Sequence, residues 1–150
     1  MDYSHRENNK GYMYDARVRP STRLNYMKKT DAKEEIPGKS RQAVENIYEY
    51  CRKNNAKLVL ISTPSTAYWN YKRHNSVAEL AESLGVEYVD MNLINDQVGI
   101  EWSTDTRDRG MHMNIYGARK CSAFLGAYLA KTEQFQDLSL IHISEPTRPY

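Results

Sequence analysis

The sequence has few of the features that mark several large classes of protein. Its 150 residues have a formal net charge of +2, and the Lys and Arg residues are interleaved with Asp and Glu. A charge this small and this evenly spread gives no basic stripe for binding a nucleic acid. The longest apolar runs are the length of a strand. We therefore predict no transmembrane helix and no signal peptide in this chain.

Motifs for cofactors and reactive thiols are also scarce. The two cysteines, Cys51 and Cys121, each lie on the apolar face of a predicted helix, which favours reduced, buried thiols over a disulfide or a metal site. No glycine-rich phosphate loop follows the strand predicted at 57–62, and no serine stands in a Gly-x-Ser-x-Gly elbow. We therefore predict no cofactor.

What remains is enough for one folded domain. Hydrophobic residues make up 40% of the chain and aromatic residues 11%, which suffices for a core. Residues 1–39 contain turn-forming Asn, Pro and Gly without a sustained period, so we interpret them as an irregular arm that packs on the body or lines a substrate cleft. Residues 40–131 carry the periodic patterns of an α/β core.

The first half of the core predicts a helix and a strand. Apolar residues recur at helical spacing from Ser40, the expected N-cap, to a stop at Asn54 and Asn55. The apolar run 57–62 follows and has the composition of a buried parallel strand. Pro64 then forces the chain out of the sheet, because proline cannot continue the hydrogen-bonded ladder.

The second half repeats this order. Ser76 and Glu79 form a capping box for a helix that Gly85 ends, and a strand follows at 86–90. Asn114 is the expected N-cap of a last helix that begins at Ile115 and ends near residue 131. Alternating helices and strands indicate a parallel sheet with right-handed crossovers.

The stretch that looks chemical runs from Asp105 to Ala118 and places two more groups, Asp108 and His112, on one loop. A carboxylate can hold an imidazole in one tautomer, which leaves the other ring nitrogen to take a proton from a nucleophile. A metal site built from these groups and His74 would match no standard zinc spacing. Acid–base chemistry at His112 is therefore the more specific hypothesis.

These residues also resemble a known family. The run Asp108-Arg-Gly-Met-His112-Met-Asn-Ile-Tyr-Gly-Ala118, preceded by Thr63-Pro-Ser65 and by Trp69-Asn70, is similar to the carboxyl-terminal half of SGNH/GDSL hydrolases. The resemblance covers residues 40–131. It implies a flavodoxin-like three-layer α/β/α sandwich with a parallel sheet, and esterase or acyltransferase activity through a Ser-His-Asp triad.

The resemblance implies roles for individual residues. His112 would be the base, Asp108 the triad acid, with Asp105 as an alternative, and the possible substrate-binding residues are Ser65, Trp69, Asn70 and Asn114. The sequence departs from the family pattern in two ways. Arg109 stands three residues before His112, where the family has its aspartate, so Gly110 must let the backbone turn tightly enough to bring Asp108 back. The Gly-Asp-Ser nucleophile block is not found in this chain.

We therefore expect residues 1–137 to be a partial SGNH hydrolase domain, with Met1 as an internal methionine. Residues 138–150 resemble the translation of a transposase-based sequencing adapter, so we expect this tail to be non-native. By analogy with the family, the intact protein would act on acyl esters of cell-envelope carbohydrate, outside the cytoplasm and anchored in a membrane. Such a fragment would be nearly inactive as an esterase.

Two alternatives stay open at this point. The chain could be a glycan-binding or envelope-assembly domain that keeps the hydrolase fold without the triad. Arg109 and the aromatic residues Tyr68, Trp69 and Tyr71 favour this hypothesis. The other alternative is a receiver-like or flavodoxin-like signalling domain, although its acidic or flavin-phosphate loops are not visible.

Overall fold

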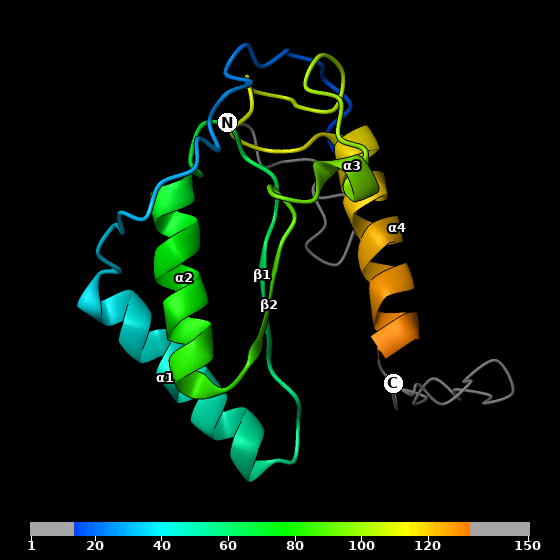
Figure 1. Ribbon diagram of the computed structural model, residues 1–150. Helices are drawn as coiled ribbons and strands as arrows, with labels where there is room; N and C mark the ends of the chain where they lie inside the picture. The colour runs from blue at the N-terminus through cyan, green and yellow to red at the C-terminus, as the bar shows by residue number, and fades with distance from the viewer. Residues whose placement is uncertain (1–13, 133–150) are drawn as a thin grey trace, which may run out of the picture.

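The computed structural model describes residues 14–132. Figure 1 shows their elements in chain order: α1 (Gly38–Lys53), β1 (Val59–Ser62), α2 (Tyr71–Leu84), β2 (Glu87–Asp90), α3 (Asn95–Val98) and α4 (Ile115–Thr132). Residues 1–13 of the predicted arm and the adapter-like tail at 138–150 lie outside the described residues.

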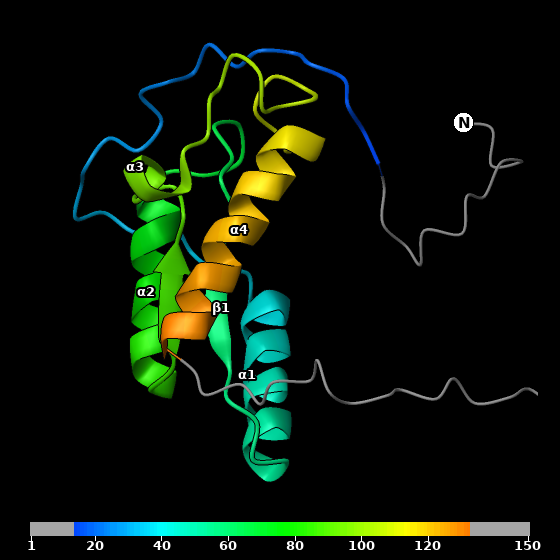
Figure 2. The same cartoon turned by 90° about the vertical axis from the view of Figure 1, so that its right-hand side faces the viewer.

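The two strands pair in parallel, as the sequence predicts. Val59 lies opposite Glu87 and Ser62 lies opposite Asp90, so both strands end at the same edge of the sheet. Helix α2 packs on β2, while Figures 1 and 2 show α4 on the other side of the strand pair. The mixed α/β class is therefore confirmed. The prediction that this first strand is buried is wrong for the described residues, because Ile61 is exposed and Val59 and Leu60 are only partly buried.

Helix α2 begins earlier than its capping box predicts. Asn70 is the N-cap, and its side-chain oxygen accepts a hydrogen bond from the backbone N–H of Arg73 at 2.9 Å. Ser76 lies inside the helix, where its hydroxyl donates to the Lys72 carbonyl. An asparagine caps as strongly as a serine, so the capping box at Ser76 is not the only start signal in this segment. The predicted stop is confirmed, since Gly85 has a φ of +64°.

Helix α1 also begins before its predicted cap. It starts at Gly38 after Pro37, without a side-chain cap, and Ser40 lies within it. The stop at Asn54 is confirmed. No residue of α1 is buried, and Ile47 is exposed. The apolar face of α1 is therefore only partly covered among the described residues, with Val44, Tyr48 and Cys51 half-buried.

The core lies between the α3 region and α4. Met91, Val98 and Ile100 are buried there, and Cys121 and Phe124 of α4 pack against them. The sequence predicts a loop where α3 lies. Both cysteines are free and partly buried, and burial raises the pKa of Cys121 to about 11, which makes that thiol unreactive. None of the described helices is long and apolar enough to cross a membrane.

Candidate functional site

The loop between α3 and α4 is held by a buried carboxylate, Asp105, of which only 2% is exposed. Its oxygens accept hydrogen bonds from the Glu101 backbone N–H at 2.8 Å and the Thr104 hydroxyl at 3.0 Å, and its third donor is the Lys120 ammonium at 2.7 Å. Burial raises the pKa of Asp105, but these donors outweigh it, so the pKa lies below its usual range. Asp105 therefore has a structural role: it fixes the loop to Lys120 of α4.

A tight turn follows Asp105. The backbone N–H of Gly110 donates to the Thr106 hydroxyl at 2.7 Å, and Gly110 has a φ of +91°. A Cβ at Gly110 would collide with the hydroxyls of Thr66 and Ser21, so no larger residue fits without movement of its neighbours. This turn brings the two ends of the segment from Asp108 to His112 together, as the sequence predicts.

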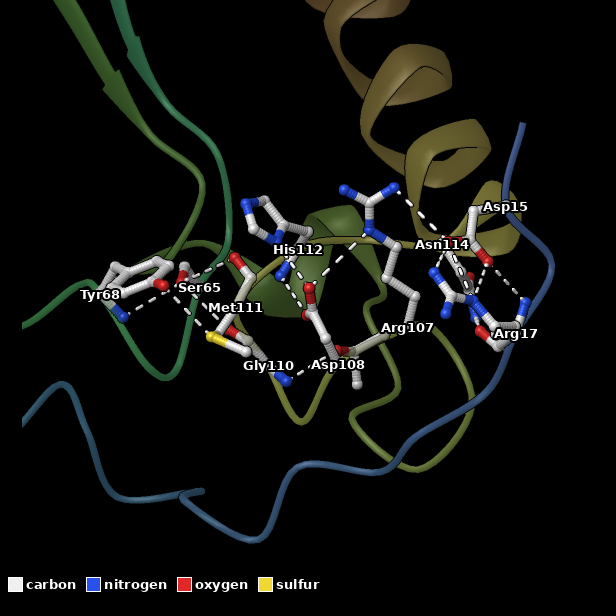
Figure 3. Close-up of polar contacts among 11 residues, drawn as sticks. Asp15, Arg17, Ser65, Tyr68, Arg107, Asp108, Gly110, Met111, His112 and Asn114 are labelled. Carbon is white, nitrogen blue, oxygen red and sulfur yellow. Dashed lines mark hydrogen bonds and ion pairs between the residues drawn. The ribbon is translucent and has the colours of Figure 1, made fainter. Parts of the chain in front are cut away.

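Asp108 and His112 form a close pair at this turn. Oδ2 of Asp108 lies 2.6 Å from Nδ1 of His112, and its Oδ1 accepts the His112 backbone N–H at 2.7 Å (Figure 3). Partial burial raises the pKa of Asp108, but the two hydrogen bonds from His112 outweigh it and hold the pKa below its usual range. The carboxylate is therefore charged at neutral pH and fixes the ring orientation.

The other edge of the imidazole is open. The side chain of His112 is 54% exposed, and within residues 14–132 its Nε2 has no hydrogen-bond partner. The ring of Tyr68 stands edge-on to it, with the ring centroids 6.1 Å apart. A neutral imidazole that donates through Nδ1 has a lone pair on Nε2. His112 can therefore accept a proton from a group that approaches from solvent.

Ser65 lies beside the pair without pairing with it. Its hydroxyl donates to the carbonyls of Gly110 and Met111, at 3.0 and 3.2 Å, and accepts the Tyr68 backbone N–H (Figure 3). The hydroxyl therefore ties the β1–α2 loop to the His112 loop. These contacts give Ser65 a positioning role and leave its proton engaged away from His112.

The amino-terminal arm, the β1–α2 loop and the His112 loop lie together, and we call these three segments the loop cluster. The backbone N–H of Arg19 donates to Thr106, and that of Arg109 donates to Arg19. Asp15 pairs with Arg17 at 2.6 Å, and this hydrogen-bonded pairing lowers the pKa of Asp15 to about 2. The arm therefore packs against the body beside the His112 loop.

The other predicted substrate-binding residues hold the structure together. Asn114 is 1% exposed and caps α4 through Oδ1, which accepts the backbone N–H groups of Tyr116 and Gly117. The predicted cap is confirmed, but a side chain this buried offers no surface to a substrate. Asn70 caps α2 and is partly buried. Trp69 donates from its indole N–H to Asp90 at 2.8 Å.

A second His–Asp pair, which the sequence analysis does not predict, lies at the end of β2. Nδ1 of His74 is 2.9 Å from Oδ2 of Asp90, and the imidazole stacks on Tyr88 and meets Tyr71 edge-on. The His74 side chain is only 19% exposed. Sequence carries little signal for this pair, because sixteen residues separate its members. Its buried setting indicates a structural role.

A cavity of about 570 Å³ opens beside the exposed pair. Its wall joins three segments that are distant in sequence: the arm at Arg23, the β1–α2 loop at Tyr68, and the His112 loop at Asp108, Arg109 and Met111. Among residues 14–132, no three His, Cys, Asp or Glu side chains come close enough to hold a metal ion.

Comparisons of this chain with protein-family models, with curated proteins and with solved structures each gave no match.

Proposed function

We propose that this chain carries the general base and its acidic partner of a serine-type enzyme that hydrolyses or transfers ester-linked acyl groups. The supporting observation is the pair at His112. Asp108 holds Nδ1 at 2.6 Å, the His112 side chain is 54% exposed, and Asp108 and the adjacent Met111 line a cavity. This arrangement of carboxylate, imidazole and open site is the acid–base part of a catalytic triad.

In this mechanism Nε2 of His112 takes the proton from a serine hydroxyl as its oxygen attacks the ester carbonyl. Asp108 stabilises the imidazolium that forms, and it keeps the ring in the tautomer that donates through Nδ1. The imidazolium then gives its proton to the departing alcohol, and a second cycle with water or an acceptor alcohol releases the acyl group. The short contact to Asp108 suits this role, since an ionised acceptor strengthens the hydrogen bond.

The nucleophile is proposed to lie outside the described residues. Ser65 donates to two backbone carbonyls, and Ser62 is buried and shares a hydrogen bond with Tyr88. Neither hydroxyl donates to His112. This is consistent with the resemblance to SGNH hydrolases, in which the serine follows an earlier strand of a three-layer α/β/α sandwich. We extend both that fold and an acyl-ester substrate of carbohydrate type to this chain as part of the proposal.

A second candidate function is glycan binding without catalysis, and one observation favours it. The Tyr68 side chain is exposed and lines the cavity, where its ring can stack on a sugar. The other two aromatic residues are less available. Trp69 is partly buried against Asp90, and Tyr71 packs on His74.

The test is to read the source locus outward in frame from both ends of this sequence and to express the protein so encoded. We expect a strand followed by Gly-Asp-Ser upstream, a serine that a fluorophosphonate probe labels, and hydrolysis of an aryl acetate. His112→Ala should lower the turnover number by about 10³-fold or more, because the base acts only with its partners. Asp108→Ala should lower it to a similar extent.

Ser65→Ala is the matched control, because this serine lies in the same cluster but is assigned no proton transfer. Turnover within about threefold of the wild type is expected. Probe labelling of Ser65 itself would overturn the assignment of the nucleophile. Turnover that survives His112→Ala would overturn the proposed chemistry, and carbohydrate binding without any turnover would favour the glycan-binding candidate.

A further inference from the structure

The cavity beside His112 is lined by two arginines from distant parts of the sequence. Arg23 comes from the arm and Arg109 from the His112 loop, and both side chains are exposed. In the part of the chain that the structure describes, neither guanidinium makes an ion pair or a hydrogen bond. Two cations without a counterion therefore face one open volume of about 570 Å³.

Other arginines of the loop cluster do have carboxylate partners. The Arg17 guanidinium pairs with Asp15 at 2.6 Å, and Arg107 lies between Asp15 and Asp108 at 3.6 and 3.8 Å. The carboxylates of the cluster are thus already matched with cations and with His112. The one carboxylate in the cavity wall, Asp108, accepts two hydrogen bonds from His112, which reduces its repulsion of an incoming anion.

The backbone at Arg109 supports a role for its side chain. Arg109 has a φ of +64°, a left-handed conformation that glycine or asparagine adopts more readily than a long side chain. The backbone N–H of Arg109 donates to the Arg19 carbonyl, which any residue could do equally well. No described contact of the guanidinium offsets this unfavourable conformation, so the local structure gives no reason for an arginine here.

We propose that this cavity binds the anionic part of the substrate, a sugar ester that carries a carboxylate or phosphate group beside the ester bond. This inference rests on the proposed function, because it assumes that the substrate of His112 binds in this cavity. Arginine presents a planar fork that matches both anions with two parallel hydrogen bonds. Tyr68 lies in the same wall, where its ring can stack on the sugar. The anion would then orient the ester toward Nε2 of His112.

The experiment measures binding and does not depend on turnover. The ¹⁵N-labelled chain is titrated with glucuronate, glucose 6-phosphate and glucose, and backbone amide shifts are followed by NMR. We expect the two anionic sugars to shift the amides of Arg23, Tyr68 and Arg109 and to bind about tenfold more tightly than glucose. Tighter binding of glucuronate would identify a carboxylate substrate, and tighter binding of glucose 6-phosphate a phosphate. The affinity should fall as salt is added.

Two variants separate binding from folding. Arg23→Gln combined with Arg109→Asn should reduce the affinity for the anionic sugars about tenfold. It should leave the thermal midpoint unchanged or raised, because asparagine tolerates the left-handed backbone. The control Arg119→Gln removes an exposed arginine of α4 outside the cavity wall and should bind as the wild type does.

Equal affinity for glucose and glucuronate would overturn the inference, as would shifts that map away from the cavity or full binding by the double variant. These outcomes are independent of the acyl-transfer proposal. An enzyme whose turnover needs His112 but which binds neutral sugars equally well would refute the anion site alone. Anion binding without any His112-dependent turnover would refute the chemistry alone.

Discussion

Residues 14–132 contain two His–Asp pairs of similar geometry, one exposed to solvent and the other largely buried. At 2.6 Å, the His112–Asp108 pair lies on a surface loop with half of the imidazole exposed. At 2.9 Å, the His74–Asp90 pair lies under aromatic rings at the end of β2. A short Nδ1–carboxylate contact is therefore not by itself a sign of catalysis. The two pairs differ in the exposure of the imidazole and in the other hydrogen bonds that each carboxylate accepts.

The carboxylates differ most. Asp90 also accepts hydrogen bonds from the side chains of Trp69 and Tyr88, and from both the backbone N–H and the side-chain amide of Asn92. Asn92 in turn accepts the Ser65 backbone N–H at 2.9 Å. Asp90 is therefore the centre of a network that holds the β1–α2 loop, whereas Asp108 serves His112 and its own turn.

The largest difference should appear when each carboxylate is removed. Asp90→Ala leaves several buried donors unsatisfied, so we expect the free energy of unfolding to fall by about 4 kcal/mol. Asp108→Ala leaves donors that water can reach and should cost about 1 kcal/mol. Urea denaturation of the two variants measures both values. Equal losses would mean that the exposed pair is structural as well.

The turn that brings Asp108 and His112 together can be disrupted by a substitution at Gly110, which leaves both residues unchanged. Gly110→Ala forces a side chain into the hydroxyls of Thr66 and Ser21 at a φ of +91°, and should cost about 3 kcal/mol. Gly85→Ala is the matched control, because Gly85 also has a positive φ but has open space around its Cβ position. It should cost about 1 kcal/mol. If the two variants lose the same stability by urea denaturation, contact with the hydroxyls does not shape the turn.

The buried carboxylate Asp105 gives a pH-dependent test. Lys120→Met removes its ammonium partner and should lower the free energy of unfolding at pH 7 by about 2 kcal/mol, less than for a fully buried pair because Lys120 is partly exposed. The folded-state pKa of Asp105 is depressed, so its stabilising effect is present above the unfolded-state pKa near 3.9 and is lost as the pH falls through the folded value.

The variant and the wild type should therefore converge in stability as the pH falls through the depressed folded-state pKa of Asp105. The comparison needs urea denaturation of both proteins from pH 7 downward. A gap that stays constant over this range would show that Lys120 acts through packing and not through its charge.

The smallest expected effect is the difference in imidazole reactivity. Diethyl pyrocarbonate acylates accessible, unprotonated imidazole nitrogens. We expect His112 to react about threefold faster than His74 at neutral pH, in proportion to exposed fractions of 54% and 19%. Mass spectrometry of proteolytic peptides assigns each rate to its residue. Faster reaction at His74 would reverse the roles given to the two pairs.

Periodic patterns made most of the fold predictable. The stop at Gly85 and the cap at Asn114 are both local signals, and both are confirmed. The starts of α1 and α2 were predicted too late, because several polar side chains near each start can cap and the sequence does not rank them. The sequence also predicts the tight turn at Gly110, because glycine adopts a positive φ there as it does at the helix stop at Gly85.

The rest of the site depends on contacts that leave no periodic trace. The arm is held to the His112 loop by backbone hydrogen bonds, such as that from Arg19 to Thr106, which any sequence can make. The pairing of His74 with Asp90 and the meeting of Arg23 with Arg109 in one cavity wall depend on tertiary packing. Local propensity cannot predict such long-range encounters.

The two members of the exposed pair are close in sequence, whereas the cavity wall near them comes from distant segments. Asp108 and His112 are four residues apart, so closing the loop between them costs little chain entropy, and the pair is a self-contained unit. The facing wall at Arg23 comes from a segment that lies more than eighty residues earlier in the chain. Under the two proposals made above, changes in the arm would therefore alter which molecule is held near His112 while the Asp108–His112 pair stays intact. In these proposals, the residues for recognition and the residues for reactivity lie on separate stretches of the chain.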